Sequence, residues 1–249
     1  MKGFWAALEF LTVLPSPEKG EFKVEDLGRS LVFFPLVGLL LGLALWGLDT
    51  GLSMVLPSLP VNVLLVGALV IITGGMHIDG FIDSCDGAAA RRTVQQRLDI
   101  MADSRVGAFG VAGGCLLLLL KVSALASLPG TVRVIGLVLM PVLGRWAMVL
   151  AVHAYPYARG PSGKGYAFKA GATMARMLLA LTTALVIAFV AARGSWHGPA
   201  LLAAASLGAV GCAWYLKTRL GGLTGDSYGA LNEVAEVLAV LLLPTMWRA

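Results

Sequence analysis

Residues 30–48 read SLVFFPLVGLLLGLALWGL, a stretch that contains no Asp, Glu, Lys or Arg. The hydrocarbon core of a bilayer is about 30 Å thick, so a helix needs about 20 mostly apolar residues to cross it. Lipid offers no hydrogen-bond partner to free backbone groups, and an apolar segment of this length must therefore be helical. The stretch predicts a membrane-spanning helix.

The rest of the chain repeats this pattern. Of its 249 residues, 58% are hydrophobic and 13% are charged, whereas a soluble domain carries about 25% charged residues. This composition excludes a disordered chain, a coiled coil and a soluble globular enzyme. We expect an all-α, polytopic helical membrane bundle that forms a single domain over residues 1–249. Seven spanning helices are predicted, near residues 31–49, 61–78, 106–127, 132–153, 173–192, 199–216 and 230–247.

The charges give this bundle an orientation. If the N-terminus lies inside, most of the 19 Lys and Arg residues fall in inner segments, while the outer segments hold Arg133, Arg193 and Arg248. The positive-inside rule favours this orientation, and it explains the net charge of +5 without nucleic acid as a partner. The first 15 residues predict an amphipathic helix at the cytoplasmic interface, because Glu9 interrupts their apolar run and no signal-peptide cleavage site follows.

Acidic residues gather after the second predicted span. Residues 77–92 read HIDGFIDSCDGAAARR, and the spacing of Asp79, Asp83 and Asp86 places them on one face of a helix. Carboxylates without thiolates select a hard cation such as Mg²⁺ or Mn²⁺. Ions held in this way suit an in-line displacement at phosphorus. The segment therefore predicts a metal site for phosphoryl transfer.

Two more acids follow in the same inner segment. Asp99 and Asp103 repeat the four-residue spacing, which predicts a second helix that carries both. All five aspartates are candidate metal ligands. The alternative is a solvated acidic loop that is neutralised by its arginines, namely Arg91, Arg92, Arg97 and Arg105.

The third inner segment is rich in glycine and basic residues. Residues 155–169 read YPYARGPSGKGYAFK. Arg159, Lys164 and the backbone amides of this loop are candidates for binding phosphate groups. The alternative is an ordinary cytoplasmic loop that is basic only because of the positive-inside rule.

Polar residues also cluster at the start of the last predicted span. Residues 221–236 read GGLTGDSYGALNEVAE, and Asn232 and Glu236 share a helix face. Polar groups inside a span are candidates for function, so Asp226, Asn232, Glu233 and Glu236 are candidates for substrate binding. The alternative is a structural bond between helices. Arg145 lies within a predicted span, and we expect it to pair with one of these acids. His77 adjoins the acidic face, either as a proton carrier or as a core histidine.

These blocks together resemble the cobalamin synthase family, also called adenosylcobinamide-GDP ribazoletransferases. The resemblance covers nearly the whole chain, and the second and third of its blocks together are highly specific. Its blocks are FLTVLP at 10–15, FPLVGLLLG at 34–42, GGMHIDGFIDSCDG at 74–87, DIMADSRVG at 99–107 and LTGDSYGA at 223–230.

The resemblance implies an integral membrane transferase. Such an enzyme joins adenosylcobinamide-GDP to α-ribazole or α-ribazole 5′-phosphate with Mg²⁺ and releases GMP. Asp79, Asp83, Asp86 and Asp103 become catalytic candidates that hold Mg²⁺, with Asp99 in support, and Asp103 is a candidate acceptor for the hydroxyl proton. Arg105 joins Arg159 and Lys164 as a candidate phosphate contact. The implied location is the cytoplasmic (inner) membrane of a bacterium or archaeon, with the site on the cytoplasmic face. A homo-oligomer is compatible with the sequence.

Two other classes of protein use similar residues. CDP-alcohol phosphotransferases begin their motif with Asp-x2-Asp-Gly-x2-Ala-Arg, which Asp83 to Arg91 match. The second half of that motif does not fit, because Asp99 and Asp103 come too early and a glycine is missing. A cation transporter is the non-enzyme alternative, but transporters place their acids near the bilayer midplane and show repeats. Neither feature is found here.

Overall fold

The computed structural model describes residues 1–18, 22–161 and 163–247, and for Gly163 and Lys164 it describes the backbone alone. In these residues the chain forms helices joined by short connections, with one isolated β-bridge between Tyr157 and Leu223. The helices are α1 (Lys2–Leu11), α2 (Val24–Ser30), η1 (Leu31–Phe33), α3 (Phe34–Leu52), α4 (Ser58–Ile72), α5 (Met76–Ala89), α6 (Val94–Ala102), α7 (Ala108–Ala126), α8 (Gly130–Ala154), α9 (Gly163–Ala170), α10 (Met174–Ala191), α11 (His197–Leu220) and α12 (Gly225–Met246).

The long helices confirm the expected polytopic membrane bundle. Within the described residues, 6 helices are long and apolar enough to cross a bilayer, and the bent pair α4 and α5 raises the number to 7 if it counts as one span. Large apolar side chains such as Leu116, Val190 and Trp214 are exposed on α7, α10 and α11. In a bilayer these side chains face lipid, so their exposure carries no penalty.

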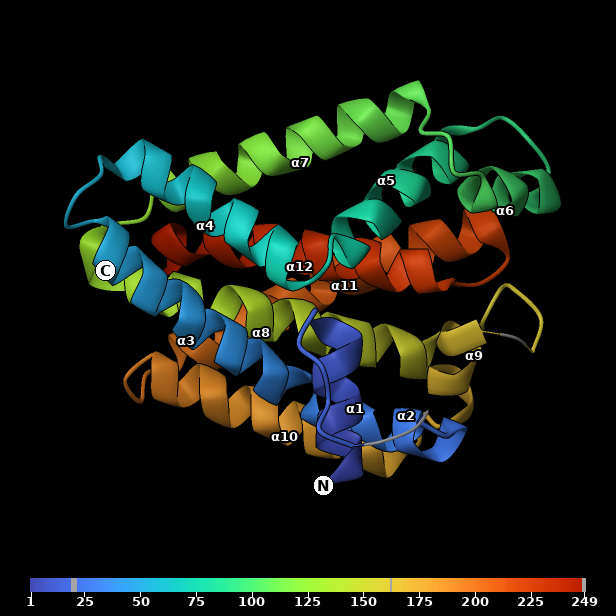
Figure 1. Cartoon of the computed structure of the whole chain (residues 1–249), viewed down its shortest axis with the longest axis horizontal. Coiled ribbons are helices and arrows are strands. Elements are labelled where there is room, and N and C mark those ends of the chain that lie inside the picture. Colours follow the sequence, from blue (N-terminus) through green and yellow to red (C-terminus); the bar gives the residue numbers. More distant parts are fainter. Residues whose placement is uncertain (19–21, 162, 248–249) are drawn as a thin grey trace.

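Helix α8 forms the centre of the bundle. Nearly every residue from Ile135 to Val149 is buried, including the charged Arg145. Helices α3 and α12 pack against α8, and Figure 1 shows α7 and α10 on opposite sides of it. The core therefore runs along the length of α8, and any polar group on this helix must find its partner inside the protein.

The predicted span 61–78 is wrong at its end. Helix α4 stops at Ile72, and α5 starts at Met76 with its axis turned by 91°. Gly74 and Gly75 have φ values of 62° and 71°, a conformation that glycine adopts without strain. Figure 1 shows α5 running toward the end of the molecule that carries α6 and α9. We treat α5 as lying outside the spanning segments, because its acids are too polar for lipid.

Helix α1 confirms the expected N-terminal helix. Ala6, Ala7 and Leu11 are buried against the bundle, whereas Glu9 is exposed. In Figure 1 the helix runs across the direction of the long helices. The segment after α1 is tied to the end of α4, because the amide of Val13 donates a hydrogen bond to the carbonyl of Ile72 over 2.8 Å. Its position at a membrane interface stays a prediction.

The last span begins earlier than the predicted residue 230. Helix α12 starts at Gly225, because the Thr224 hydroxyl accepts a hydrogen bond from the amide of Ser227 over 3.1 Å and caps the helix. This early start places Asp226 in the first turn of α12. The polar residues predicted to lie before the span are therefore on the same helix as Asn232 and Glu236.

Candidate active site

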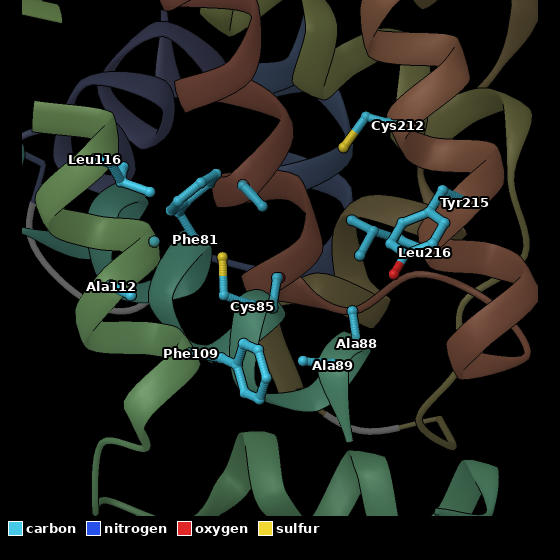
Figure 2. Close-up of a pocket in the computed structure, with 13 residues that line it drawn as sticks. Phe81, Cys85, Ala88, Ala89, Phe109, Ala112, Leu116, Cys212, Tyr215 and Leu216 are labelled. Carbon is cyan, nitrogen blue, oxygen red and sulfur yellow. The ribbon is translucent and has the colours of Figure 1, made fainter. Parts of the chain in front are cut away.

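The aspartates of α5 lie on one face of the helix, as their spacing predicted. Asp79 is exposed, and Asp83 and Asp86 are partly buried. The opposite face contributes Phe81 and Cys85 to a separate apolar cavity between α5, α7, α11 and α12. Figure 2 shows these two side chains pointing into that cavity. Helix α5 thus separates an acidic surface from an apolar one.

Asp226 joins the α5 aspartates from the first turn of α12. A Cβ atom on Gly80 would lie only 2.6 Å from the backbone oxygen of Asp226, so the two helices approach this closely only because residue 80 is glycine. The carboxylate of Asp226 lies 3.1 Å from the guanidinium of Arg159. The helix contact therefore brings a fourth carboxylate and one cation to the acidic face of α5.

A backbone contact holds Arg159 in place. The amide of Ala158 donates a hydrogen bond to the carbonyl of Leu223, and the amide of Leu223 donates to the carbonyl of Pro156, both over 2.8 Å. These bonds join the segment after α8 to the segment before α12. The predicted phosphate contact Arg159 and the predicted substrate contact Asp226 thus belong to one assembly.

The electrostatics of this group centre on Asp83. Its pKa is raised to about 6, first because the side chain is partly buried and then because Asp79, Asp226 and Asp86 place negative charge beside it. The cation of Arg159 opposes this shift. Like charges at short range disfavour ionisation, and a bound cation relieves that repulsion. The group is therefore suited to bind a cation.

Asp86 has a second set of partners that the sequence did not predict. Its two carboxylate oxygens accept hydrogen bonds from the amides of Gly107 and Gly110, over 2.7 and 2.8 Å. These amides lie at the start of α7, where helix backbone donors have no partner in the helix and the helix dipole favours an anion. Asp86 thus caps α7 from the neighbouring helix, and its role as a metal ligand stays a prediction.

Asp99 and Asp103 have hydrogen-bond or ion-pair partners outside α5. The expected helix carrying both is wrong in its length, because α6 ends at Ala102 and Asp103 follows it in an extended conformation. Asp99 accepts a hydrogen bond from Gln95 on the exposed face of α6. Asp103 pairs with Arg105 over 2.6 Å, and this contact lowers the pKa of Asp103 to about 2. Neither carboxylate is among the charges that shift the pKa of Asp83.

The metal site is not preassembled in the described part of the chain. Among the side chains that the structure describes, no three His, Cys, Asp or Glu residues are grouped closely enough to hold an ion. The donors that gather at the α5 face are all carboxylate oxygens, the ligand type that Mg²⁺ prefers. Magnesium keeps several waters and binds through one or two carboxylates plus substrate phosphates, so a preassembled group of three is not required.

The remaining basic candidates differ in position. Arg105 is highly exposed and bonds to Asp103, so a phosphate would have to compete with that carboxylate. Lys164 lies in α9, but its side chain is outside the described residues. Arg97, which the sequence offered only as a neutralising charge, is buried and donates hydrogen bonds to the carbonyls of Gly87 and Ala88 at the end of α5.

The other polar residues of α12 form a buried cluster in the middle of the bundle. Arg145 pairs with Glu236, which confirms the expected pairing of this arginine with an acid. Lys121 of α7 pairs with both Glu233 and Glu236, the latter over 2.6 Å. The amide of Asn232 donates to Glu236 over 3.1 Å, so their shared face is confirmed. This cluster links α7, α8 and α12, and a substrate role for its acids stays a prediction.

Lys121 was not predicted from the sequence as a partner in this cluster. The available signal was its position as a lone cation in an otherwise apolar span, since such a charge needs a carboxylate partner within the protein. Also not predicted were Tyr228 and three phenylalanines, Phe10, Phe34 and Phe168, which come together beside Asp79 and Asp226. No local sequence pattern indicates residues that come together from four separate helices, α1, α3, α9 and α12.

Comparisons with known proteins agree on one family. The family model described as cobalamin-5-phosphate synthase matches residues 3–244. A protein of Desulfitobacterium hafniense (strain Y51), named adenosylcobinamide-GDP ribazoletransferase, is 40% identical over 247 residues, which cover 97% of this chain and 96% of that protein. Proteins of the same name from Desulforamulus reducens and Geotalea daltonii are each 38% identical, over 95% and 96% of this chain and 94% and 96% of theirs. No solved structure matches the chain.

Proposed function

Because the chain belongs to the cobalamin-5-phosphate synthase family, we propose that it is an adenosylcobinamide-GDP ribazoletransferase of the membrane. The observation that carries the activity is the match of the family model to residues 3–244, together with relatives of that name that align over nearly their whole length. This family match favours the transferase over a CDP-alcohol phosphotransferase or a cation transporter.

The proposed reaction is a displacement at phosphorus. The ribose 3′-hydroxyl oxygen of α-ribazole, or of its 5′-phosphate, forms a bond to the phosphorus that carries the cobinamide. The bond from that phosphorus to the oxygen of GMP breaks, so GMP leaves and the cobalamin nucleotide loop is closed. No oxidant or reductant is needed. Negative charge grows on the departing phosphate, which is the charge that the site must stabilise.

The acidic face of α5 is the proposed Mg²⁺ site. Asp79, Asp83 and the neighbouring Asp226 would hold the ion, and when bound it would neutralise charge on the diphosphate. The support is the pKa of Asp83, which three other carboxylates help to raise to about 6, because such crowding of negative charge favours a bound cation. Asp86, Asp99 and Asp103 stay weaker candidates for metal binding, because each carboxylate already has another partner.

The side chains at this site would also bind a substrate phosphate and remove the proton from the attacking hydroxyl. Arg159, already beside Asp226, is placed to contact a substrate phosphate. A carboxylate of the α5 face would accept the hydroxyl proton. Asp103 is the weaker candidate for that role, because its contact with Arg105 lowers its pKa to about 2 and a carboxylate with so low a pKa is a poor base.

The proposed location is the cytoplasmic membrane, with the site facing the cytoplasm. Figure 1 shows α6, α9 and the turn between α11 and α12 at one end of the bundle. The basic segments that hold Arg91, Arg159 and Lys217 belong to this end. The positive-inside rule assigns such an end to the cytoplasm, where nucleotide substrates are made.

The direct test is an assay of the purified full-length protein in detergent. The protein is mixed with adenosylcobinamide-GDP, α-ribazole and Mg²⁺, and the release of GMP and the mass of the corrinoid product are followed together. We expect equal amounts of GMP and a cobalamin product. The α-ribazole 5′-phosphate is assayed in parallel, and the acceptor with the higher kcat/KM is the preferred one.

Two controls connect the activity to the acidic face. EDTA should abolish product formation and added Mg²⁺ should restore it. Asp83→Asn should lower kcat by about 100-fold or more, the size expected when a metal or proton-transfer group is lost. Glu25→Gln removes an exposed carboxylate on α2 and should leave kcat unchanged. Full activity of Asp83→Asn would refute the assignment of the site, whereas absence of product from folded wild-type protein would refute the proposed reaction.

A further inference from the structure

A small cavity lies next to the acidic face of α5. Its volume is about 170 Å³, and it is lined by residues from α1, α3, α5, α8, α9 and α12. Three aromatic rings form much of its wall, with centroids 4.5 Å apart for Phe10 and Phe168 and 5.6 Å apart for Phe34 and Phe168. We call it the aromatic cavity, and its defining residues are Phe10, Phe34, His77, Asp79, Phe168, Gly225, Asp226 and Tyr228.

Two residues that line the aromatic cavity each carry a buried polar atom without a partner. The Nε2 atom of His77 and the hydroxyl of Tyr228 are buried, and neither makes a hydrogen bond within the described structure. The two side chains are only 1% and 3% exposed. Buried polar groups in proteins are almost always paired, so these two residues of the cavity lining leave at least one donor free for a hydrogen bond to a bound ligand.

The cavity borders the proposed reaction site. Asp79 and Asp226 line it, and both belong to the carboxylate group at the contact of α5 and α12. A ligand that fills the aromatic part therefore holds its next chemical group beside these carboxylates. The occupant must combine a flat apolar part with a polar part that reacts.

We propose that the aromatic cavity binds the benzimidazole base of the α-ribazole acceptor. The inference rests on the proposed function and adds to it the place and the recognition of one substrate. The base is a flat two-ring system with two methyl groups, and it has one ring nitrogen free to accept a hydrogen bond. The hydroxyl of Tyr228 supplies the donor, and the ribose then extends toward Asp79 and Asp226.

The guanine of the other substrate fits this cavity poorly. Guanine carries several donors and acceptors on its edges, and each would lose its bonds to water on entering a cavity walled by phenylalanine. His77 and Tyr228 cannot replace all of those bonds, and the other polar side chains of the lining, Asp79 and Asp226, belong to the proposed Mg²⁺ site. A dimethylated base has the opposite composition, because burial of its apolar surface is favourable and its single acceptor needs a single donor.

The larger cavity shown in Figure 2 is a weaker candidate for the acceptor. Its volume is about 390 Å³, and Phe81, Cys85 and Cys212 are among the residues that line it. No carboxylate lines it, and it lies on the side of α5 that faces away from the aspartates. A nucleoside bound there would have its hydroxyl groups separated from the acidic face by the helix itself.

The test measures binding of α-ribazole alone to the full-length protein in detergent. Equilibrium dialysis without Mg²⁺ or corrinoid separates this step from catalysis. Tyr228→Phe removes one hydroxyl and keeps the ring, and it should weaken binding by about tenfold, the size of one hydrogen bond. Gly225→Leu adds a side chain at a cavity-lining position where a Cβ meets no atom within 4 Å, and it should weaken binding by more than tenfold.

A matched control separates filling of the cavity from the effect of a leucine on a helix. Gly211→Leu places the same side chain on an exposed part of α11, where a Cβ also meets no atom within 4 Å, and it should leave binding unchanged. In steady-state assays the first two variants should raise the KM for α-ribazole. The KM for adenosylcobinamide-GDP should stay within about twofold of the wild-type value.

The outcomes are distinguishable. If wild-type protein turns over both substrates but Tyr228→Phe and Gly225→Leu bind α-ribazole normally, this inference is wrong and the proposed function stands. A rise only in the KM for adenosylcobinamide-GDP also overturns it, because the cavity would then serve the other substrate. If folded wild-type protein neither binds α-ribazole nor forms product, both the proposed function and this inference are wrong.

Discussion

Replacing Lys121 by methionine removes one of the two cations in the buried cluster of α7, α8 and α12. Lys121 is 1% exposed and contacts the carboxylates of Glu233 and Glu236, while Arg145 contacts Glu236 alone. The substitution therefore leaves two carboxylates with one cation. Methionine is similar in length to lysine, so the lost charge, rather than a cavity, dominates the effect.

The size of the effect follows from this uncompensated charge. Removal of one partner from a buried ion pair costs about 3–5 kcal/mol, and about 1 kcal/mol corresponds to about 2–4 °C in Tm for a chain of this size. We expect the Tm of Lys121→Met to fall by roughly 10 °C. Thermal unfolding in detergent, followed by tryptophan fluorescence, measures it. Lys217→Met on the exposed side of α11 is the matched control and should change the Tm by less than about 2 °C.

A double variant tests whether the uncompensated charge causes the loss of stability. Among the described residues Glu233 forms an ion pair with Lys121 alone, so Lys121→Met combined with Glu233→Gln leaves the Arg145–Glu236 pair intact and balanced in charge. The double variant should recover at least half of the lost Tm, because no buried charge is then without a partner. If the two substitutions destabilise additively, or if Lys121→Met unfolds at the wild-type temperature, the cluster is not the electrostatic unit described above.

Four further predictions concern the acidic face and its support. The Mg²⁺ concentration for half-maximal activity should fall as the pH rises from about 5 to about 7. The reason is that Asp83, whose pKa is raised to about 6, must lose its proton to bind the ion. A Mg²⁺ titration that shows no change over this pH range would contradict the prediction. The same shift means that Asp83 favours the folded state only while protonated, so its contribution to stability is lost as the pH rises through about 6. Asp86→Ala should lower stability by about 1 kcal/mol through loss of the α7 cap, measured by thermal unfolding, with Asp99→Ala as the exposed comparison. Gly80→Ala should reduce kcat more than it changes either KM, because a Cβ 2.6 Å from the backbone of Asp226 must push α5 and α12 apart. An unaltered kcat would mean that this contact does not set the geometry of the site.

Local patterns were sufficient for the helices and for the acidic face. Charge-free runs predict a span because the bilayer permits little else, and residues 30–48 form most of α3 as expected. The spacing of Asp79, Asp83 and Asp86 fixes their common face as soon as the segment is helical. The pairing of Arg145 was predictable because a charge within a span must find an opposite charge.

The remaining features depend on which helices touch. Asp86 caps α7 only because the start of α7 packs beside α5, and its sequence neighbours do not reveal this. The pairing of Asp103 with Arg105 depends on where α6 ends, because Asp103 follows the helix in an extended conformation. The aromatic cavity needs Phe10, Phe34 and Phe168 from three distant segments. Such tertiary contacts carry no periodicity that a single sequence displays.

The buried cluster also has a consequence for the synthesis of the protein. Lys121 precedes its partner Glu233 by 112 residues, and Arg145 precedes Glu236 by 91. During translation, Lys121 and Arg145 therefore reach the membrane long before the carboxylates that neutralise them have been synthesised. Until α12 is inserted, α7 and α8 hold charges that lipid does not tolerate well. A chain that stops before Gly225 lacks both Asp226 and the neutralising carboxylates, so insertion of α12 supplies the buried cluster and the acidic face with their missing acids in one step.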